Sequence, residues 1–170
     1  FFKEFIGSGV TSFIMSELRE KKNLIYNVTV DNYTTPYGTY LTIEISTKNK
    51  NVEDVAFGVI KILKNLVRGK FSHDYLKYVK KAYMVEHHTQ CKNNEYLNHF
   101  YVQQYINQLY NPTEDMVILE PQEVTKNIME LEKLKFVLFL KKLIIFSNMK
   151  IAYQGKREIK NLQSLVLKRI

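Results

Sequence analysis

The stretch from Gly7 to Tyr26 constrains the fold most, because an amphipathic helix runs there almost directly into a strand. Its apolar residues recur at helical spacing: Val10, Ile14 and Leu18. A charged run beginning at Arg19 follows, and Asn23 is a suitable helix stop. Residues 24–30 then alternate between apolar and polar. The sequence therefore predicts Arg19 at a helix C-terminus, seven residues before Tyr26 at the start of a strand.

Two alternating segments, residues 24–33 and 39–47, predict an antiparallel hairpin. In the second segment the apolar residues lie on one face: Leu41, Ile43 and Ile45. The connection contains Pro36 and Gly38, which are turn residues.

Helical patterns dominate the rest of the chain. We expect one helix from an Asn51 cap to a stop at Gly69, one from a Ser72 cap to about Gln90, and one over residues 94–109. A loop over residues 113–121 leads to a fourth helix, residues 122–142, with one apolar side: Ile128, Leu131, Leu134 and Leu138. A short strand, Met149–Tyr153, and a helical pattern over residues 157–170 follow.

This order of elements predicts an α+β fold, with an antiparallel sheet and helices packed on one of its faces. Three strands make a narrow sheet for so many helices, so we expect its first strands to precede Phe1. The chain would then hold a partial domain over residues 1–155 and a C-terminal helical tail over residues 156–170.

Composition limits the possible locations and partners of the protein. Of the 170 residues, none lie in an uncharged apolar run long enough for a membrane span. Cys91 is the only cysteine, which suits a reducing compartment, and we expect an intracellular location in the cytoplasm or an organelle matrix. The net charge of +8 admits an anionic partner such as nucleic acid, but the lysines are scattered along predicted helices, which favours a solvated surface.

Residues 6–26 resemble the insulinase/pitrilysin superfamily of zinc peptidases, the inverzincins. The match is carried by Ile6-Gly7-Ser8-Gly9, by Leu18-Arg19-Glu20-Lys21 and by Leu24-Ile25-Tyr26-Asn27-Val28. The later order of elements extends the likeness to about residue 155. Ser8 and Asn23 stand where the family has glycine, and asparagine tolerates the left-handed conformation expected at a helix end.

The resemblance implies the second-half, non-zinc domain of a zinc metalloendopeptidase that encloses peptides in a chamber. It implies catalytic and substrate-binding roles for Arg19 and Tyr26, with Arg19 holding a substrate carbonyl and Tyr26 donating to the substrate or the oxyanion. It also implies a partner domain that binds the zinc. From the pattern alone, Arg19 is equally a cation that stabilises the helix dipole, and Tyr26 a packed aromatic on the face of Val28 and Val30.

The zinc motif H-x-x-E-H is absent from this sequence, and we expect no metal site in this chain. Glu86-His87 has tyrosine, Tyr83, in place of the first histidine, and zinc needs about three protein ligands. The pattern predicts solvent-facing positions for Glu86, His87 and His88. His73 and His99 are isolated as well.

Three functions remain open. The first is the enzyme part described above. The second is a catalytically inactive, structural or partner-binding subunit of the same fold. The third is a basic nucleic-acid-binding domain, although no recognition motif of that class is present.

Overall fold

The computed structural model describes residues 1–7, 12–35, 38–110, 112, 117–156, 159 and 161–168. The helices are α1 (Phe2–Ile6), α2 (Val52–Val67), α3 (His73–Gln90), α4 (Asn94–Tyr110), α5 (Pro121–Glu130), α6 (Lys133–Leu143) and α7 (Leu162–Lys168). The π-helix η1 (Met15–Glu20), the strands β1 (Ile25–Thr35) and β2 (Gly38–Thr47), and the short 3-10 turns η2 (Asn49–Asn51) and η3 (Phe146–Asn148) complete the described elements. The predicted α+β class is confirmed.

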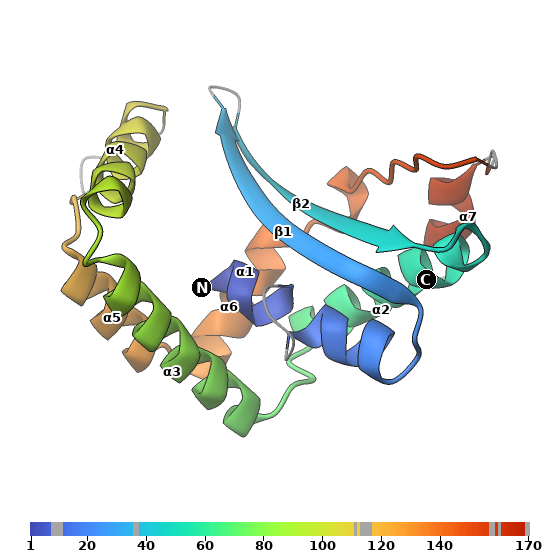
Figure 1. The fold of residues 1–170 in the computed structure, drawn as a ribbon, viewed down its shortest axis with the longest axis horizontal. Helices are drawn as coiled ribbons and strands as arrows, with labels where there is room; N and C mark the ends of the chain where they lie inside the picture. The colour runs from blue at the N-terminus through green and yellow to red at the C-terminus, as the bar shows by residue number, and fades with distance from the viewer. Residues whose placement is uncertain are drawn as a thin grey trace.

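The predicted hairpin is confirmed, with β1 and β2 antiparallel in one two-stranded sheet. One face carries the apolar residues of both strands and lies over α1, η1, α2 and α6 (Figure 1). On the other face Tyr33 and Tyr40 stack, with ring centroids 5.4 Å apart. Pro36, in the predicted turn, lies outside the described residues.

Helix α2 forms where the pattern predicts it, and its buried residues include Val55, Ile62 and Leu66. It ends before Gly69, whose φ of +70° is a left-handed conformation that glycine adopts without steric cost. The predicted side-chain cap is wrong: the Asn51 amide Nδ2 instead donates to the Leu24 carbonyl oxygen, at 3.3 Å. Asn51 therefore ties the start of α2 to the entrance of β1.

Helix α3 is capped as predicted by Ser72, whose hydroxyl oxygen accepts a hydrogen bond from the Tyr75 backbone N–H at 3.0 Å. Phe71 before the cap and Leu76 inside the helix are both buried in the main core. The helix ends at Gln90, also as predicted.

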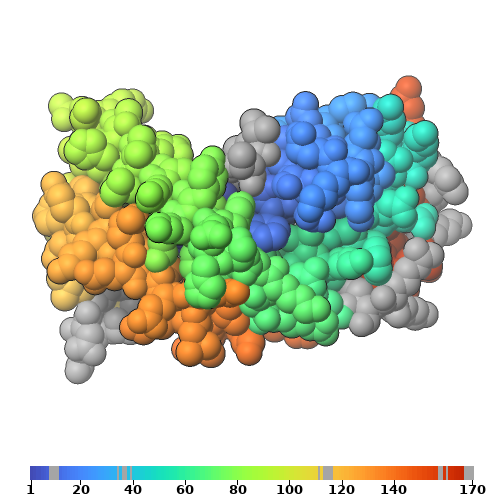
Figure 2. Space-filling model, turned by 90° about the horizontal axis from the view of Figure 1, so that it is seen from below, coloured from blue at the N-terminus to red at the C-terminus, as the bar shows by residue number. Residues whose placement is uncertain are grey.

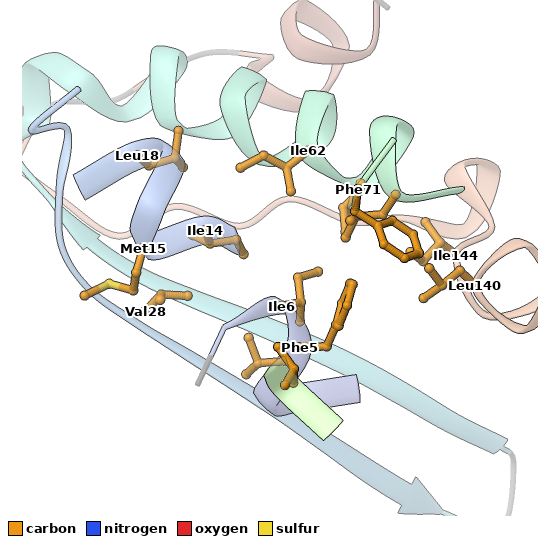
Figure 3. Close-up of a cluster of buried hydrophobic side chains, with 14 of the residues drawn as sticks. Phe5, Ile6, Ile14, Met15, Leu18, Val28, Ile62, Phe71, Leu140 and Ile144 are labelled. Atoms are coloured by element: carbon orange, nitrogen blue, oxygen red, sulfur yellow. The ribbon is translucent and has the colours of Figure 1, made fainter. Parts of the chain in front are cut away.

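The main core is gathered around α1 (Figure 3). The Phe5 ring lies 4.8 Å from the Phe136 ring, centroid to centroid, in an edge-to-face arrangement. The chain leaves α1 through Gly7, where an added Cβ would lie 2.0 Å from Cγ2 of Val30. Glycine is therefore required there for α1 to lie directly against β1.

The predicted helix over residues 122–142 is wrong, because the chain is extended at Leu131 and Glu132 and splits it into α5 and α6. The break changes the helical phase, since an extended residue does not advance the chain by 100°. Phe136 and Leu140 are buried in α6, whereas Leu134 and Leu138, predicted on the apolar side, are 69% and 51% exposed.

The predicted strand Met149–Tyr153 is also wrong: the described residues there form no strand. Gln163 of α7 takes the backbone bonds that a neighbouring strand would take. Its Oε1 accepts from the Ile151 N–H at 3.2 Å, and its Nε2 donates to the Met149 carbonyl at 3.2 Å. Helix α7 packs against α2 in a second cluster: Val52, Ile60, Leu162 and Val166. The division at residue 155 stays a prediction.

None of the helices in the described part of the chain is long and apolar enough to cross a membrane.

Candidate functional site

The helix that carries Arg19 is a π-helix rather than the α-helix that the spacing suggests. Residues 8–11, including Val10, lie outside the described residues. Leu18 anchors the π-helix on α2, because Gly58 there has no side chain, and an added Cβ would lie 2.7 Å from Cδ2 of Leu18 (Figure 3). π-helical segments are rare and are often found at functional sites.

The π-helix ends at Glu20, and a short turn leads to Asn23, the predicted stop. This residue has φ of +51°, the left-handed conformation that asparagine tolerates. The Asn23 N–H donates to the Arg19 carbonyl, and the Leu24 N–H donates to the Leu18 carbonyl, each at 2.8 Å. These two bonds satisfy terminal carbonyls and turn the chain straight into β1.

Strand β1 begins with a bulge at Tyr26. Ile25 pairs with Thr47 and Asn27 pairs with Ser46, so Tyr26 is an extra residue without a partner on β2. The bulge shifts the alternation: Ile25 and Val28 are buried, while Tyr26 is 55% exposed. The interpretation of Tyr26 as a packed aromatic is therefore wrong.

The structure brings the two predicted site residues together. Nη1 of Arg19 donates to the backbone carbonyl oxygen of Tyr26 at 2.6 Å, and both side chains are exposed. An ion pair between Lys21 and Glu17 lies on the same helix. The guanidinium has five N–H donors. Arg19 thus fixes the bulge from which the Tyr26 ring projects, and it keeps donors for a further acceptor.

The described residues do not offer a zinc site, since no three of their His, Cys, Asp or Glu side chains gather to hold a metal ion. Glu86 and His88 are exposed as predicted, and Glu86 accepts a hydrogen bond from Gln90 at 3.0 Å. His73 and His99 are exposed as well.

His87 contradicts its prediction: it is only 3% exposed. Its ring packs against Tyr83 on α3 and against Tyr96 and Phe100 on α4, at centroid distances of 5.3, 5.9 and 5.8 Å. The sequence signal was present in two aromatic pairs at helical spacing, Tyr83 with His87 and Tyr96 with Phe100. Single-helix periodicity does not show that these pairs face each other.

The His87 ring is only half satisfied. Nδ1 lies 3.2 Å from Sγ of Cys91, whereas the buried Nε2 has no hydrogen-bond partner among the described residues. A buried, unpaired polar atom costs about 1–3 kcal/mol. Burial also lowers the pKa of His87, because a charged imidazolium loses hydration there.

The chain is similar to known proteins in fold and, over part of its length, in sequence. No curated protein matches the chain. Two solved structures share its fold. One is described as a protease from Helicobacter pylori, at 16% identity and a TM-score of 0.62. The match covers 83% of this chain and 32% of the chain of that protease. The other is described as a conserved protein from Enterococcus faecalis V583, at 19% identity and a TM-score of 0.65, covering 83% and 31%.

The chain thus spans about a third of the length of these two proteins. A separate match, in sequence alone, covers the segment that contains α1, the π-helix, the hairpin, α2 and most of α3. The predicted resemblance is confirmed there: residues 1–83 match the family described as the Peptidase M16 inactive domain.

Proposed function

We propose that this chain is the substrate-positioning, non-zinc domain of a zinc metalloendopeptidase, with Arg19 and Tyr26 as its contribution to the peptide-binding chamber. The observation that carries the proposal is the hydrogen bond from Arg19 to the Tyr26 carbonyl at the β1 bulge. It lies inside the segment that matches the Peptidase M16 inactive domain.

Arg19 has two tasks in this proposal. One N–H holds the bulge in place, which fixes the direction in which the Tyr26 ring leaves the strand. The remaining donors of its planar guanidinium bind a substrate backbone carbonyl. The exposure of the Arg19 side chain supports this second task, because a buried guanidinium would have to be fully paired within the domain.

Tyr26 supplies a hydroxyl donor. Its side chain stands away from the hydrophobic face of the hairpin and is 55% exposed. A phenolic O–H on a fixed strand donates to a substrate carbonyl or to the oxyanion of the tetrahedral intermediate, and its position needs no reorganisation during the reaction. The bulge makes this possible, since regular alternation would turn the ring into the core.

Activation of water belongs to a partner domain. The ligating side chains in the described part of this chain do not gather into a metal site. The zinc and the general base must therefore come from another domain, in the same or another chain, and this domain completes the chamber around the peptide. On its own, the chain is expected to bind no stoichiometric zinc and to cleave no peptide.

The test is Tyr26→Phe in the full-length protein, assayed with a quenched fluorescent peptide and with zinc content measured in parallel. We expect kcat to fall about 10-fold or more, as for loss of a single oxyanion donor, with thermal stability and zinc content unchanged. Tyr33→Phe is the matched control, because Tyr33 is 46% exposed on the same strand but lies far from the bulge.

A rate equal to wild type for Tyr26→Phe, with zinc intact, would overturn the role of Tyr26. One tight zinc bound per 170-residue chain in a metal analysis would overturn the proposal that another domain supplies the zinc. A full-length protein without any H-x-x-E-H sequence would instead assign the chain to an inactive structural subunit.

A further inference from the structure

Leu24 lies between Arg19 and Tyr26 along the chain, and its backbone is held from both sides. Its N–H donates to the Leu18 carbonyl of the π-helix at 2.8 Å. Its carbonyl oxygen accepts two side-chain donors, Oγ1 of Thr47 at 2.5 Å and Nδ2 of Asn51 at 3.3 Å. A carbonyl oxygen has two lone pairs, so both of its acceptor positions are used.

The two donors belong to elements that meet at one end of the molecule. Thr47 is the last residue of β2, and Asn51 directly precedes α2. In Figure 2 the blue segment that includes η1 lies against the cyan region around the end of β2 and the blue-green region of α2. Both side chains are half-buried, which strengthens their hydrogen bonds relative to bonds in open solvent.

The hairpin has a competing register at this point. In the structure Ile25 pairs with Thr47, and Tyr26 is the extra residue of the bulge. In a register without the bulge, Tyr26 would pair with Thr47 and Ile25 would move one position outward. Because side chains alternate between the two faces, Tyr26 would then lie on the buried face with Val28, and Ile25 on the outer face. The two registers thus exchange the places of Ile25 and Tyr26.

The hydrogen bonds to Leu24 favour the bulged register. They hold the residue before Ile25 against the end of β2, which keeps Ile25 opposite Thr47. A slip of one residue would draw the Leu24 carbonyl about 3.3 Å along the strand and break both bonds. The bond from Arg19 to the Tyr26 carbonyl fixes the other side of the bulge.

We propose that Thr47 and Asn51 are positioning residues for Tyr26: their bonds to the Leu24 carbonyl hold the bulge in the register that exposes the ring. The inference rests on the proposed function and deepens it, because it adds two residues that act through Tyr26 without touching the substrate. The sequence pattern assigns Thr47 only to a strand and Asn51 only to a helix cap.

The first test compares near-isosteric substitutions of Thr47 in the full-length protein, with the quenched fluorescent peptide as substrate. Thr47→Val keeps the branched shape and removes the donor, whereas Thr47→Ser keeps the donor. We expect Thr47→Val to lower kcat about 5-fold or more with KM nearly unchanged, and Thr47→Ser to stay within about 2-fold of wild type.

Thr42→Val is the matched control. Oγ1 of Thr42 also donates from β2 to a carbonyl of β1, that of Asp31, at 3.4 Å, but away from the bulge. Its kcat and KM should equal those of wild type. Equal kinetics of Thr47→Val and Thr42→Val would overturn the proposal.

Asn51→Asp separates positioning from helix capping. Aspartate is as good a residue as asparagine at the start of a helix, so a role limited to starting α2 predicts wild-type turnover. Its carboxylate cannot donate to the Leu24 carbonyl. We therefore expect kcat to fall about 5-fold or more, and wild-type turnover would remove Asn51 from the proposal.

Double variants test whether these effects pass through Tyr26. If they do, Thr47→Val adds little to the fall in kcat that Tyr26→Phe already causes, because a ring without its hydroxyl gains nothing from correct placement. Effects of Thr47→Val and Tyr26→Phe that multiply would show that Thr47 acts independently and would overturn the proposal.

A spectroscopic measurement follows the ring itself. In protein labelled with fluorotyrosine, the fluorine NMR resonance of Tyr26 is the one lost in Tyr26→Phe, and its shift between light and heavy water reports the exposure of the ring. Thr47→Val and Asn51→Asp should reduce this shift, and Thr42→Val should not. An unchanged Tyr26 resonance in both variants would overturn the proposal even if kcat falls.

The two proposals can fail separately. A wild-type rate for Tyr26→Phe would overturn the proposed function, and the fluorine measurement would still decide whether Thr47 and Asn51 hold the ring. A lowered kcat for Tyr26→Phe, with wild-type kinetics and resonances for Thr47→Val and Asn51→Asp, would overturn the present inference alone.

Discussion

Tyr26 and His87 depart in opposite directions from the burial that the sequence pattern predicts for them. The alternation of β1 places Tyr26 in the core, and the structure exposes 55% of it; the sequence of α3 places His87 in solvent, and the structure buries 97% of it. In the first case a local irregularity, the bulge, overrides the pattern. In the second case a distant helix, α4, covers the side chain. Both polar groups are thereby placed where a regular pattern would not put them.

The largest effect expected from this comparison comes from placing a carboxylate at each position. His87→Glu should lower the free energy of unfolding by about 3 kcal/mol or more, because the ring cage offers no partner for the charge. Tyr26→Glu should change it by less than about 0.5 kcal/mol, since the position is exposed. Urea denaturation of both variants measures the difference. Similar losses at the two positions would contradict the contrast in burial.

Removing the orphaned nitrogen should have a smaller effect of the opposite sign. His87→Phe keeps an aromatic ring among Tyr83, Tyr96 and Phe100 and eliminates the unpaired Nε2. We expect a gain of about 1 kcal/mol in the free energy of unfolding. Thermal and urea denaturation are the measurements, with His88→Phe at the exposed neighbour as control. A clear loss of stability would show that Nε2 is satisfied in solution.

The pH dependence of stability should separate wild type from His87→Phe. Burial lowers the folded-state pKa of His87 below its ordinary value of 6.5, so the unfolded chain binds the proton more readily. Stability from this group is therefore complete above about pH 6.5 and is lost as the pH falls below it. Between about pH 7.5 and about pH 5.5, wild type should lose more stability than His87→Phe. Parallel losses, measured by urea titration, would assign the acid sensitivity elsewhere.

The smallest effect is expected for Tyr26→Phe, which removes one exposed hydroxyl. The free energy of unfolding should change by less than about 0.5 kcal/mol, because the Tyr26 side chain is 55% exposed and water can hydrate the hydroxyl. Denaturation of the isolated chain is sufficient to measure it. A larger loss would mean that the hydroxyl is a structural bond, and any loss of peptidase turnover would then no longer report on catalysis.

The sequence predicted what depends on neighbours in the chain. The Ser72 cap, the left-handed turn at Asn23 and the hairpin are local, and the structure has all three. The fold class and the family resemblance follow from the same local signals. Asn51 shows the limit, since its residue type is right for a cap but its amide binds Leu24 from another element instead.

What could not be predicted depends on contacts between distant segments. The break at Leu131 follows from the packing of Phe136 and Leu140 on the core, which no spacing within residues 122–142 reveals. The expected strand at residues 149–153 is replaced because a side chain 12 residues after Ile151, Gln163, occupies its backbone groups. The candidate site was predicted as a pair of residues, but the bond from Arg19 to the Tyr26 carbonyl needed the π-helix and the bulge together.

The π-helix has a consequence for how this segment can vary between related proteins. Arg19 lies seven residues before Tyr26, so deleting one of residues 20–25 would move the Tyr26 carbonyl away from the Arg19 guanidinium that donates to it. Such a deletion would leave hydrophobicity and charge nearly unchanged. Surface loops tolerate gain or loss of residues, whereas here the number of residues determines whether Arg19 can donate to the Tyr26 carbonyl. The length of the segment sets the distance between the Arg19 guanidinium and the Tyr26 carbonyl. Natural variation in this segment should therefore take the form of substitutions rather than changes of length.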